Sequence, residues 1–235
     1  MTAIRTVAET GSTNADMAAL ARSGLGEGVW LRAERQTQGR GRLGRSWVSP
    51  PDNLYASTLV RLRPTDPAGA TLGLTVSVAL HEAVRAYLRA GELLLKWPND
   101  LLLGGAKLSG VLLERVDDAV VVGVGVNLAH HPDLPDRATT SLAAAGVEVA
   151  PDHFAETLAE TFARRLSTWR GQGVAPVRAA WLERAHPIGA ALSARMPDGS
   201  VLDGLFAGLD RDGALNLRLA DGRTRVIHAG DILLS

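Results

Sequence analysis

Cysteine is absent from the chain, which excludes disulfides, thiolate metal sites and a cysteine nucleophile, and favours a reducing compartment. Aromatic residues make up only 4% of the sequence, so the stacking platforms that bind single-stranded nucleic acids are scarce. Net charge is also absent, because 25 basic residues balance 25 acidic ones. The surface as a whole is therefore not a nucleic-acid-binding field, and any basic site is local.

Long apolar runs are missing as well. The N-terminus has no apolar segment of the kind found in secretory signals. The most apolar run, residues 119–129, is shorter than the roughly 20 residues that span a bilayer. We therefore expect a soluble, cytoplasmic protein that does not contact membranes. Hydrophobic residues still make up 46% of the 235 positions, which is enough for a buried core.

A change in the pattern of apolar residues and turns predicts two domains, residues 1–186 and residues 187–235. The first part mixes strand-like alternation with helical periodicity. Helices are expected over residues 15–24, in a stretch ending at Gly91, and over residues 140–146, 150–173 and 175–185. The second part has short, evenly spaced strand patterns separated by PDG, RDG and ADG turns. Such spacing indicates a small β-barrel.

Residues 36–47, QTQGRGRLGRSW, are called the arginine loop below. Gly39, Gly41 and Gly44 spell the dinucleotide-binding fingerprint. That fingerprint must open a helix, and the residues that follow, SWVSPP, cannot begin one because of the paired prolines. An acidic residue at a strand end about 20 positions further on is also missing. A dinucleotide site of this type is therefore excluded.

The charge of the arginine loop favours anions. Arg40, Arg42 and Arg45 lie among its glycines, and Arg35 directly precedes it. Guanidinium groups bind carboxylates and phosphates bidentately, and glycines let the backbone wrap around an anion. A solvated basic loop and an RNA-binding loop are the alternatives. The density of arginine beside Gln36 and Trp47 favours a small-molecule anion site.

The two lysines form a second unusual feature, because Lys96 and Lys107 are the only lysines among 25 basic residues. Both lie at ends of predicted strands, where ligands often bind, although snorkelling is the simpler interpretation of each alone. Asp100, after the turn at Pro98, is a turn former, a proton acceptor or a Mg²⁺ ligand. The six histidines show no metal-ligand spacing, and we assign no metal ligands.

Five motifs in one order resemble the biotin–protein ligases. They are GSTN at 11–14, the arginine loop, KWPND at 96–100, KLSGVLLE at 107–114 and GVGVN at 123–127. The resemblance implies an α+β fold, in which helices flank a mixed β-sheet catalytic domain of the class II synthetase-like type and a small SH3-like β-barrel follows. The sequence is similar to the monofunctional members of that family, since no N-terminal helix-turn-helix precedes the first predicted strand. DNA binding is therefore not expected.

The resemblance implies an ATP- and Mg²⁺-dependent reaction that converts biotin to biotinyl-5′-AMP. The biotin is then transferred to a lysine of the biotin carboxyl carrier protein domain of acetyl-CoA carboxylase or a related enzyme. Lys107, Arg40 and Asp100 are then expected to be catalytic, with Asp100 meeting the target lysine. The implied biotin site comprises Ser12, Thr13, Asn14, Gln36, Gly39, Arg40, Lys107, Gly110 and Gly123. The implied ATP or adenylate site comprises Arg40, Arg42, Arg45, Trp47, Lys96, Lys107 and Asn127.

Two other functions remain open at this point. A lipoate–protein ligase shares the catalytic fold, and a nucleic-acid-binding module would use the arginine loop alone. The sequence is compatible with a monomer or a homodimer.

Overall fold

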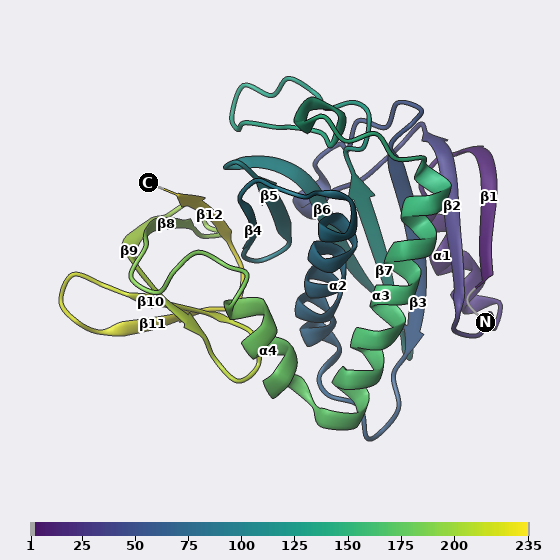
Figure 1. Ribbon diagram of the computed structural model, residues 1–235. Coiled ribbons are helices and arrows are strands. Elements are labelled where there is room, and N and C mark those ends of the chain that lie inside the picture. Colours follow the sequence, from purple (N-terminus) through teal and green to yellow (C-terminus); the bar gives the residue numbers. More distant parts are fainter. Residues whose placement is uncertain (1–2, 235) are drawn as a thin grey trace.

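The computed structural model describes residues 3–234 and contains two β-sheets (Figure 1). The first is seven-stranded, in the order β1-β2-β3-β7-β6-β5-β4. Its strands are β1 (Ala3–Thr10), β2 (Val29–Gln36), β3 (Leu54–Arg61), β4 (Leu93–Lys96), β5 (Asp100–Leu103), β6 (Ala106–Val116) and β7 (Ala119–Val126). Only β1 and β2 pair in parallel, and the other neighbours are antiparallel, so the sheet is mixed.

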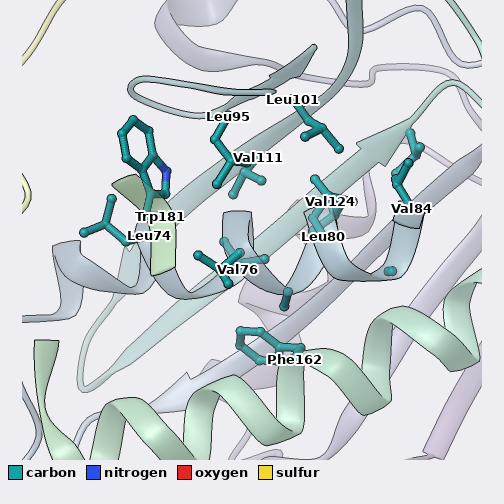
Figure 2. Packing of buried hydrophobic residues seen from close by; sticks show 14 of the residues in the cluster. Leu74, Val76, Leu80, Val84, Leu95, Leu101, Val111, Val124, Phe162 and Trp181 are labelled. Atoms are coloured by element: carbon teal, nitrogen blue, oxygen red, sulfur yellow. The ribbon is translucent and has the colours of Figure 1, made fainter. Parts of the chain in front are cut away.

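Helices cover both faces of this sheet. On one face lie α2 (Leu72–Tyr87) and α3 (Pro151–Gln172), followed by α4 (Val174–Leu182). The large hydrophobic core lies here, where α2 contributes Leu74, Val76, Leu80 and Val84 and α3 contributes Phe162 (Figure 2). Most residues of α2 are buried, because the helix packs against α3, α4 and the sheet, and its sequence is accordingly apolar nearly all round.

The opposite face is covered only in part. Helix α1 (Thr13–Arg22) packs on β3 and β7, where Met17 and Ala21 meet Leu59 and Val121 in a smaller apolar cluster. Beyond the N-terminal end of α1 the same sheet face carries small residues instead of large apolar ones. That uncovered part of the sheet is the floor of the site described below.

The second sheet has five antiparallel strands in the order β11-β10-β9-β8-β12. They are β8 (Ala191–Arg195), β9 (Val201–Leu209), β10 (Leu215–Arg218), β11 (Thr224–Ile227) and β12 (Asp231–Leu234). It follows the seven-stranded sheet in sequence, with α4 ending at Leu182 and β8 beginning at Ala191. The division at residues 186 and 187 stays a prediction. Within residues 3–234 no helix has the length and apolarity to cross a membrane.

One expected helix is wrong. Residues 140–146 form only a single 3₁₀ turn, η3 (Ala143–Ala145), although the segment is rich in alanine. Its backbone bonds instead to the preceding strand segment: Leu142 N–H donates to Asn127 O at 3.1 Å and Ala143 N–H to Leu128 O at 2.9 Å. Gly146, at φ 76°, ends the turn. Tertiary hydrogen bonds therefore override the helix propensity of the segment.

Candidate active site

The floor of the site is a row of residues that runs across five strands. The antiparallel registers pair Lys96 with Asp100, Asp100 with Gly110, Gly110 with Gly125 and Gly125 with Tyr55. Directly opposed residues in antiparallel strands point to the same face of a sheet. The glycines therefore make a flat floor in the middle of the row, with the charged pair on β4 and β5 at one end.

A polar cluster lies next to this floor, at the start of α1. Ser57 Oγ donates to Asn14 Oδ1 at 2.7 Å and lies 2.8 Å from Thr13 Oγ1, while Asn14 Nδ2 donates to Glu114 Oε2 at 2.7 Å. Gln36 Oε1 accepts the N–H of Thr13 at 2.8 Å. Gln36 thus replaces a conventional N-cap, and Ser12, the N-cap residue, keeps its side chain free of any cap bond.

A β-bulge brings Lys107 to the floor. The pairing of β5 with β6 shifts between Leu101 and Leu102, so that Leu102 faces Lys107 while Asp100 faces Gly110. Bulges change the side-chain alternation of a strand and re-aim side chains. As a result, Lys107 Nζ lies 2.6 Å from Asp100 Oδ1, within a partly buried ion pair. Asp100 Oδ1 is nevertheless buried without a well-aligned hydrogen bond among residues 3–234.

The arginine loop folds over this floor. Its backbone closes through a bridge between Arg40 and Ser46, and Leu43 at its tip is exposed with φ 57°. The indole of Trp47 lies on the glycine floor so closely that a Cβ added to Gly125 would stand 2.6 Å from the ring. Lys107 Nζ lies 5.5 Å from the Trp47 ring centroid, a cation–π contact. The Trp47 Nε1 is buried and has no partner within the described residues.

Gly39 has a structural role in the same loop. A Cβ added at Gly39 would stand 2.4 Å from the carbonyl oxygen of Trp47 and 2.7 Å from Ser49 Oγ. Only glycine therefore lets the two ends of the loop approach, as the hydrogen bond of 2.9 Å from Trp47 N–H to Gly39 O requires.

The second sheet reaches the arginine loop through Asp231, a residue that sequence reasoning missed. Arg45 donates to Asp231 Oδ2, and Arg42 Nη1 lies 3.6 Å from Asp231 Oδ1 and 3.1 Å from Asn99 Oδ1. Burial lowers the pKa of Arg42, which the charges of Asp231 and Asp100 partly oppose. Burial alone would raise the pKa of Asp231, but the hydrogen bond and charge of Arg45 bring it below its ordinary value.

The substitution Asp231→Asn is expected to loosen the arginine loop. It removes the charge that holds Arg42 and Arg45, so tryptic cleavage within residues 40–45 of the ligand-free protein should become about threefold to tenfold faster, as for two partly exposed ion pairs. Limited proteolysis with mass mapping of the cut sites measures this. The matched control is Asp203→Asn, since Asp203 bonds to Ser193 within the second sheet. Equal cleavage rates for the two variants would contradict the contact.

Of Lys96 and Asn127, only Asn127 lines the cavity. Lys96 stands beside Asp100 in the cross-strand row but not in the cavity lining. Burial lowers its pKa, with the charge of Asp100 acting in the other direction. Asn127 follows β7, lines the cavity, and donates through Nδ2 to Thr140 O at 3.0 Å. Its amide thus ties the end of the central strand to the segment that closes the site.

A cavity of about 260 Å³ joins these parts. Of the sequence-predicted residues, all line it except Gly39 and Lys96. Those that do are Ser12, Thr13, Asn14, Gln36, Arg40, Arg42, Arg45, Trp47, Asp100, Lys107, Gly110, Gly123 and Asn127. Sequence reasoning missed Tyr55, Leu112, Asp136, Arg137, Thr139 and Asp231. Arg35 is elsewhere, in an exposed ion pair with Glu9. The roles assigned to these residues stay predictions.

Within residues 3–234 the side chains of histidine, aspartate and glutamate form no cluster of three that could hold a metal ion. The cavity combines a polar pocket, a glycine floor, a lysine–carboxylate pair and a basic loop. Such a combination suits a reaction that joins two anionic substrates, because cations must neutralise their repulsion.

Comparisons with known proteins agree with this chemistry. Residues 20–127 match the model of the biotin/lipoate A/B protein ligase family, and residues 188–235 match that of the biotin protein ligase C-terminal domain. A biotin–[acetyl-CoA-carboxylase] ligase from Paracoccus denitrificans is 42% identical, with 96% of this chain and 98% of the relative covered. The enzyme of the same name from Mycobacterium tuberculosis is 38% identical, covering 97% and 87%.

Solved structures show the same fold. The biotin protein ligase from Aquifex aeolicus, in complex with biotin and ATP, superposes with a TM-score of 0.86 over 100% of this chain and 99% of the other, at 24% identity. The expected α+β architecture, with a mixed sheet and a small C-terminal β-unit, is thereby confirmed.

The fold and the sequence matches thus define a protein of the biotin and lipoate ligase class. Within that class the chain belongs to the biotin–protein ligase family, which it matches over nearly its whole length.

Proposed function

We propose that this protein activates biotin with ATP to biotinyl-5′-AMP and transfers the biotin to a specific lysine of a biotin carboxyl carrier protein domain, as a biotin–[acetyl-CoA-carboxylase] ligase. The observation that carries this proposal is the position of the Lys107–Asp100 pair. The pair lines the same cavity as the polar cluster of α1 and the arginine loop. The full-length similarity to enzymes of that name supports the substrates.

In this proposal the biotin ring binds at the polar end of the cavity. Thr13, Asn14 and Gln36 offer the donors and acceptors that a ureido group needs, while Ser12 contributes a hydroxyl that makes no cap hydrogen bond. Gly123 leaves the space that the Asn14 amide occupies, and Gly125 leaves the space on which the Trp47 indole lies, so both groups sit low enough to face a bound ring. The valeryl carboxylate would then extend along the floor toward Lys107, with Gly110 in the same wall.

Lys107 and the arginines carry the first step. The carboxylate oxygen attacks the α-phosphorus of ATP, a new C–O–P linkage forms, and the bond from that phosphorus to pyrophosphate breaks. Lys107 is able to contact both reacting anions as a compact point charge. Arg40, Arg42 and Arg45 would neutralise the growing charge and close the loop over the mixed anhydride, which excludes water. Trp47, whose buried Nε1 has no partner among residues 3–234, would pack on the adenylate side.

Asp100 acts in the second step. In the ligand-free site it is paired with Lys107. Once substrate anions take over Lys107, the carboxylate is free to accept the proton of the incoming target amine as that amine attacks the acyl carbon and AMP leaves. Magnesium would enter as the companion of the nucleotide and would neutralise phosphate charge. We assign it no protein ligand, because Asp100 is paired with Lys107 and Asp231 with Arg42 and Arg45.

We place this reaction in the cytoplasm, where its substrate ATP is abundant. Monomer and homodimer are both compatible with the proposal, because every residue it uses comes from one chain.

The direct test is a retained acyl-adenylate. The purified protein is incubated with MgATP and either biotin or lipoate, desalted, and examined by native mass spectrometry. We expect biotinyl-AMP to be retained and lipoyl-AMP to be absent at equal substrate concentrations. Retention of lipoyl-AMP in preference to biotinyl-AMP would favour a lipoate ligase. Retention of neither adenylate would refute the proposed function.

A further inference from the structure

The cavity has a wall that the sequence motifs did not predict. It is formed by residues 129–140, the segment between β7 and η3, called the wall loop below. The wall loop is fastened to the strand of Lys107: Lys107 N–H donates to Ala138 O at 2.9 Å, and Thr140 N–H donates to Lys107 O at 3.0 Å. Thr139 also forms a parallel bridge with Lys107. The backbone next to Arg137 is therefore fixed relative to the reacting centre.

Arg137 lines the cavity from this anchored wall. Its side chain is 29% exposed, and its partner is the neighbouring Asp136, whose side chain is 60% exposed. Both contacting nitrogens, Nε at 3.1 Å and Nη2 at 2.5 Å, meet the same oxygen of Asp136. An ion pair so open to solvent is easily exchanged, and a phosphate offers the guanidinium a better bidentate partner.

The charges around Arg137 are those of the phosphate end of the cavity. Hydrogen bonding to Asp136 raises the pKa of Arg137, against the effect of burial, and the charges of Asp100 and Asp231 add to the rise. The pKa of Asp136 is lowered chiefly by its hydrogen bond to Arg137, and the charge of Arg45 lowers it further. Burial is the largest cause of the lowered pKa of Lys96; the charge of Asp100 opposes it, and the charges of Lys107 and Arg137 add to it. Cations thus converge on one volume from both walls.

We propose that Arg137 is a nucleotide-binding residue that takes the β- and γ-phosphates of ATP and holds the departing pyrophosphate. Asp136 occupies its guanidinium until the nucleotide arrives. This inference rests on the proposed function, since it assigns a further residue to its first half-reaction. Arg137 differs from the arginines of the arginine loop because the backbone next to it, at Ala138 and Thr140, is bonded to the Lys107 strand. A side chain carried by an anchored backbone needs less reorganisation when phosphate binds.

The test separates the two half-reactions. For Arg137→Ala we expect the KM for ATP in biotin-dependent pyrophosphate exchange to rise about tenfold to a hundredfold, as for the loss of a charge-assisted hydrogen bond. Arg137→Lys, which keeps the charge and loses the fork, should fall between this variant and wild type. Transfer from supplied biotinyl-AMP to the carrier domain should proceed at the wild-type rate in both variants.

Two further variants serve as controls. Arg211→Ala removes another exposed arginine that pairs with its sequence neighbour, Asp212, in the second sheet, and its KM for ATP should equal that of wild type. Asp136→Asn should leave the KM for ATP equal or lower, since it frees the guanidinium. A rise matching that of Arg137→Ala would show that the pair is structural and overturn the inference.

The pattern of the results also distinguishes this inference from the proposed function. An Arg137→Ala variant that transfers slowly and has an unchanged KM for ATP would assign Arg137 to the carrier domain instead and refute nucleotide binding. Failure of the proposed function has a different signature, because the wild-type protein itself would then catalyse no biotin-dependent exchange.

Discussion

Replacing Lys107 with alanine is expected to lower the rate of biotinyl-AMP formation by about a thousandfold, at the upper end of what the loss of one transition-state donor costs. Lys107 lines the cavity that the polar cluster and the arginine loop share, and its ammonium has Asp100 as its ion-pair partner. Without it, two anions must meet beside a buried carboxylate that has lost its counter-ion. Single-turnover formation of the adenylate measures the effect.

Arginine should not rescue this position. A Cβ at Gly110 would stand 3.4 Å from Lys107 Nζ, and the ammonium also lies against the Trp47 ring. The planar guanidinium fork is larger and differently directed than an ammonium. We therefore expect Lys107→Arg to remain at least about a hundredfold below wild type. The fold control is Arg115→Ala, on the same strand, where the side chain is exposed and bonds only to Asp117 O. Adenylate formation at the wild-type rate by Lys107→Ala would refute the mechanism.

The Lys107 site also shows what the sequence could predict. The motifs identified both lysines, the glycines and Asp100 because their residue types are unusual in such positions. The sequence did not reveal that Lys107 and Gly110 share a face, since strict alternation would place residues three apart on opposite sides. The bulge opposite Leu101 and Leu102 changes that alternation. Bulges depend on hydrogen bonding between strands, which local sequence does not determine.

Asp231 and Arg137 were missed for a related reason. Asp231 contacts Arg45 although the two residues are 186 positions apart in the sequence. Strand β12 carries no motif that would connect it with the arginine loop. Arg137 lies in a polar segment that resembles an ordinary loop. Only the backbone bonds from Lys107 to Ala138 and from Thr140 to Lys107 place it beside the cavity. Long-range contacts of this kind follow from the packing of whole elements.

The second large effect is expected for Gly123→Ala, which should abolish tight biotin binding. A Cβ at Gly123 would stand 2.1 Å from Asn14 Oδ1. Asn14 cannot move away freely, since Ser57 and Glu114 hold its amide in a buried site. We expect at least about a hundredfold loss of biotin affinity and a free energy of unfolding lowered by about 2–4 kcal/mol, as buried hydrogen bonds are broken. Calorimetric titration and thermal melting measure the two effects.

Gly171→Ala is the matched control for the same chemical change, because a Cβ there meets nothing within 4 Å and the residue lies in α3. It should leave biotin affinity unchanged and stabilise the fold by about 0.5 kcal/mol. Unchanged biotin affinity in Gly123→Ala would contradict the assignment of this floor to biotin.

The double variant Asn14→Ala with Gly123→Ala separates stability from binding. Truncating Asn14 vacates the space that the new methyl group requires, so the two substitutions should be strongly non-additive in the free energy of unfolding. The double variant should melt well above Gly123→Ala alone. Biotin affinity should stay low, because the amide that we assign to the ureido ring is gone. Recovery of affinity together with stability would show that Asn14 only fills space, and would move the ring-binding role to Thr13 and Gln36.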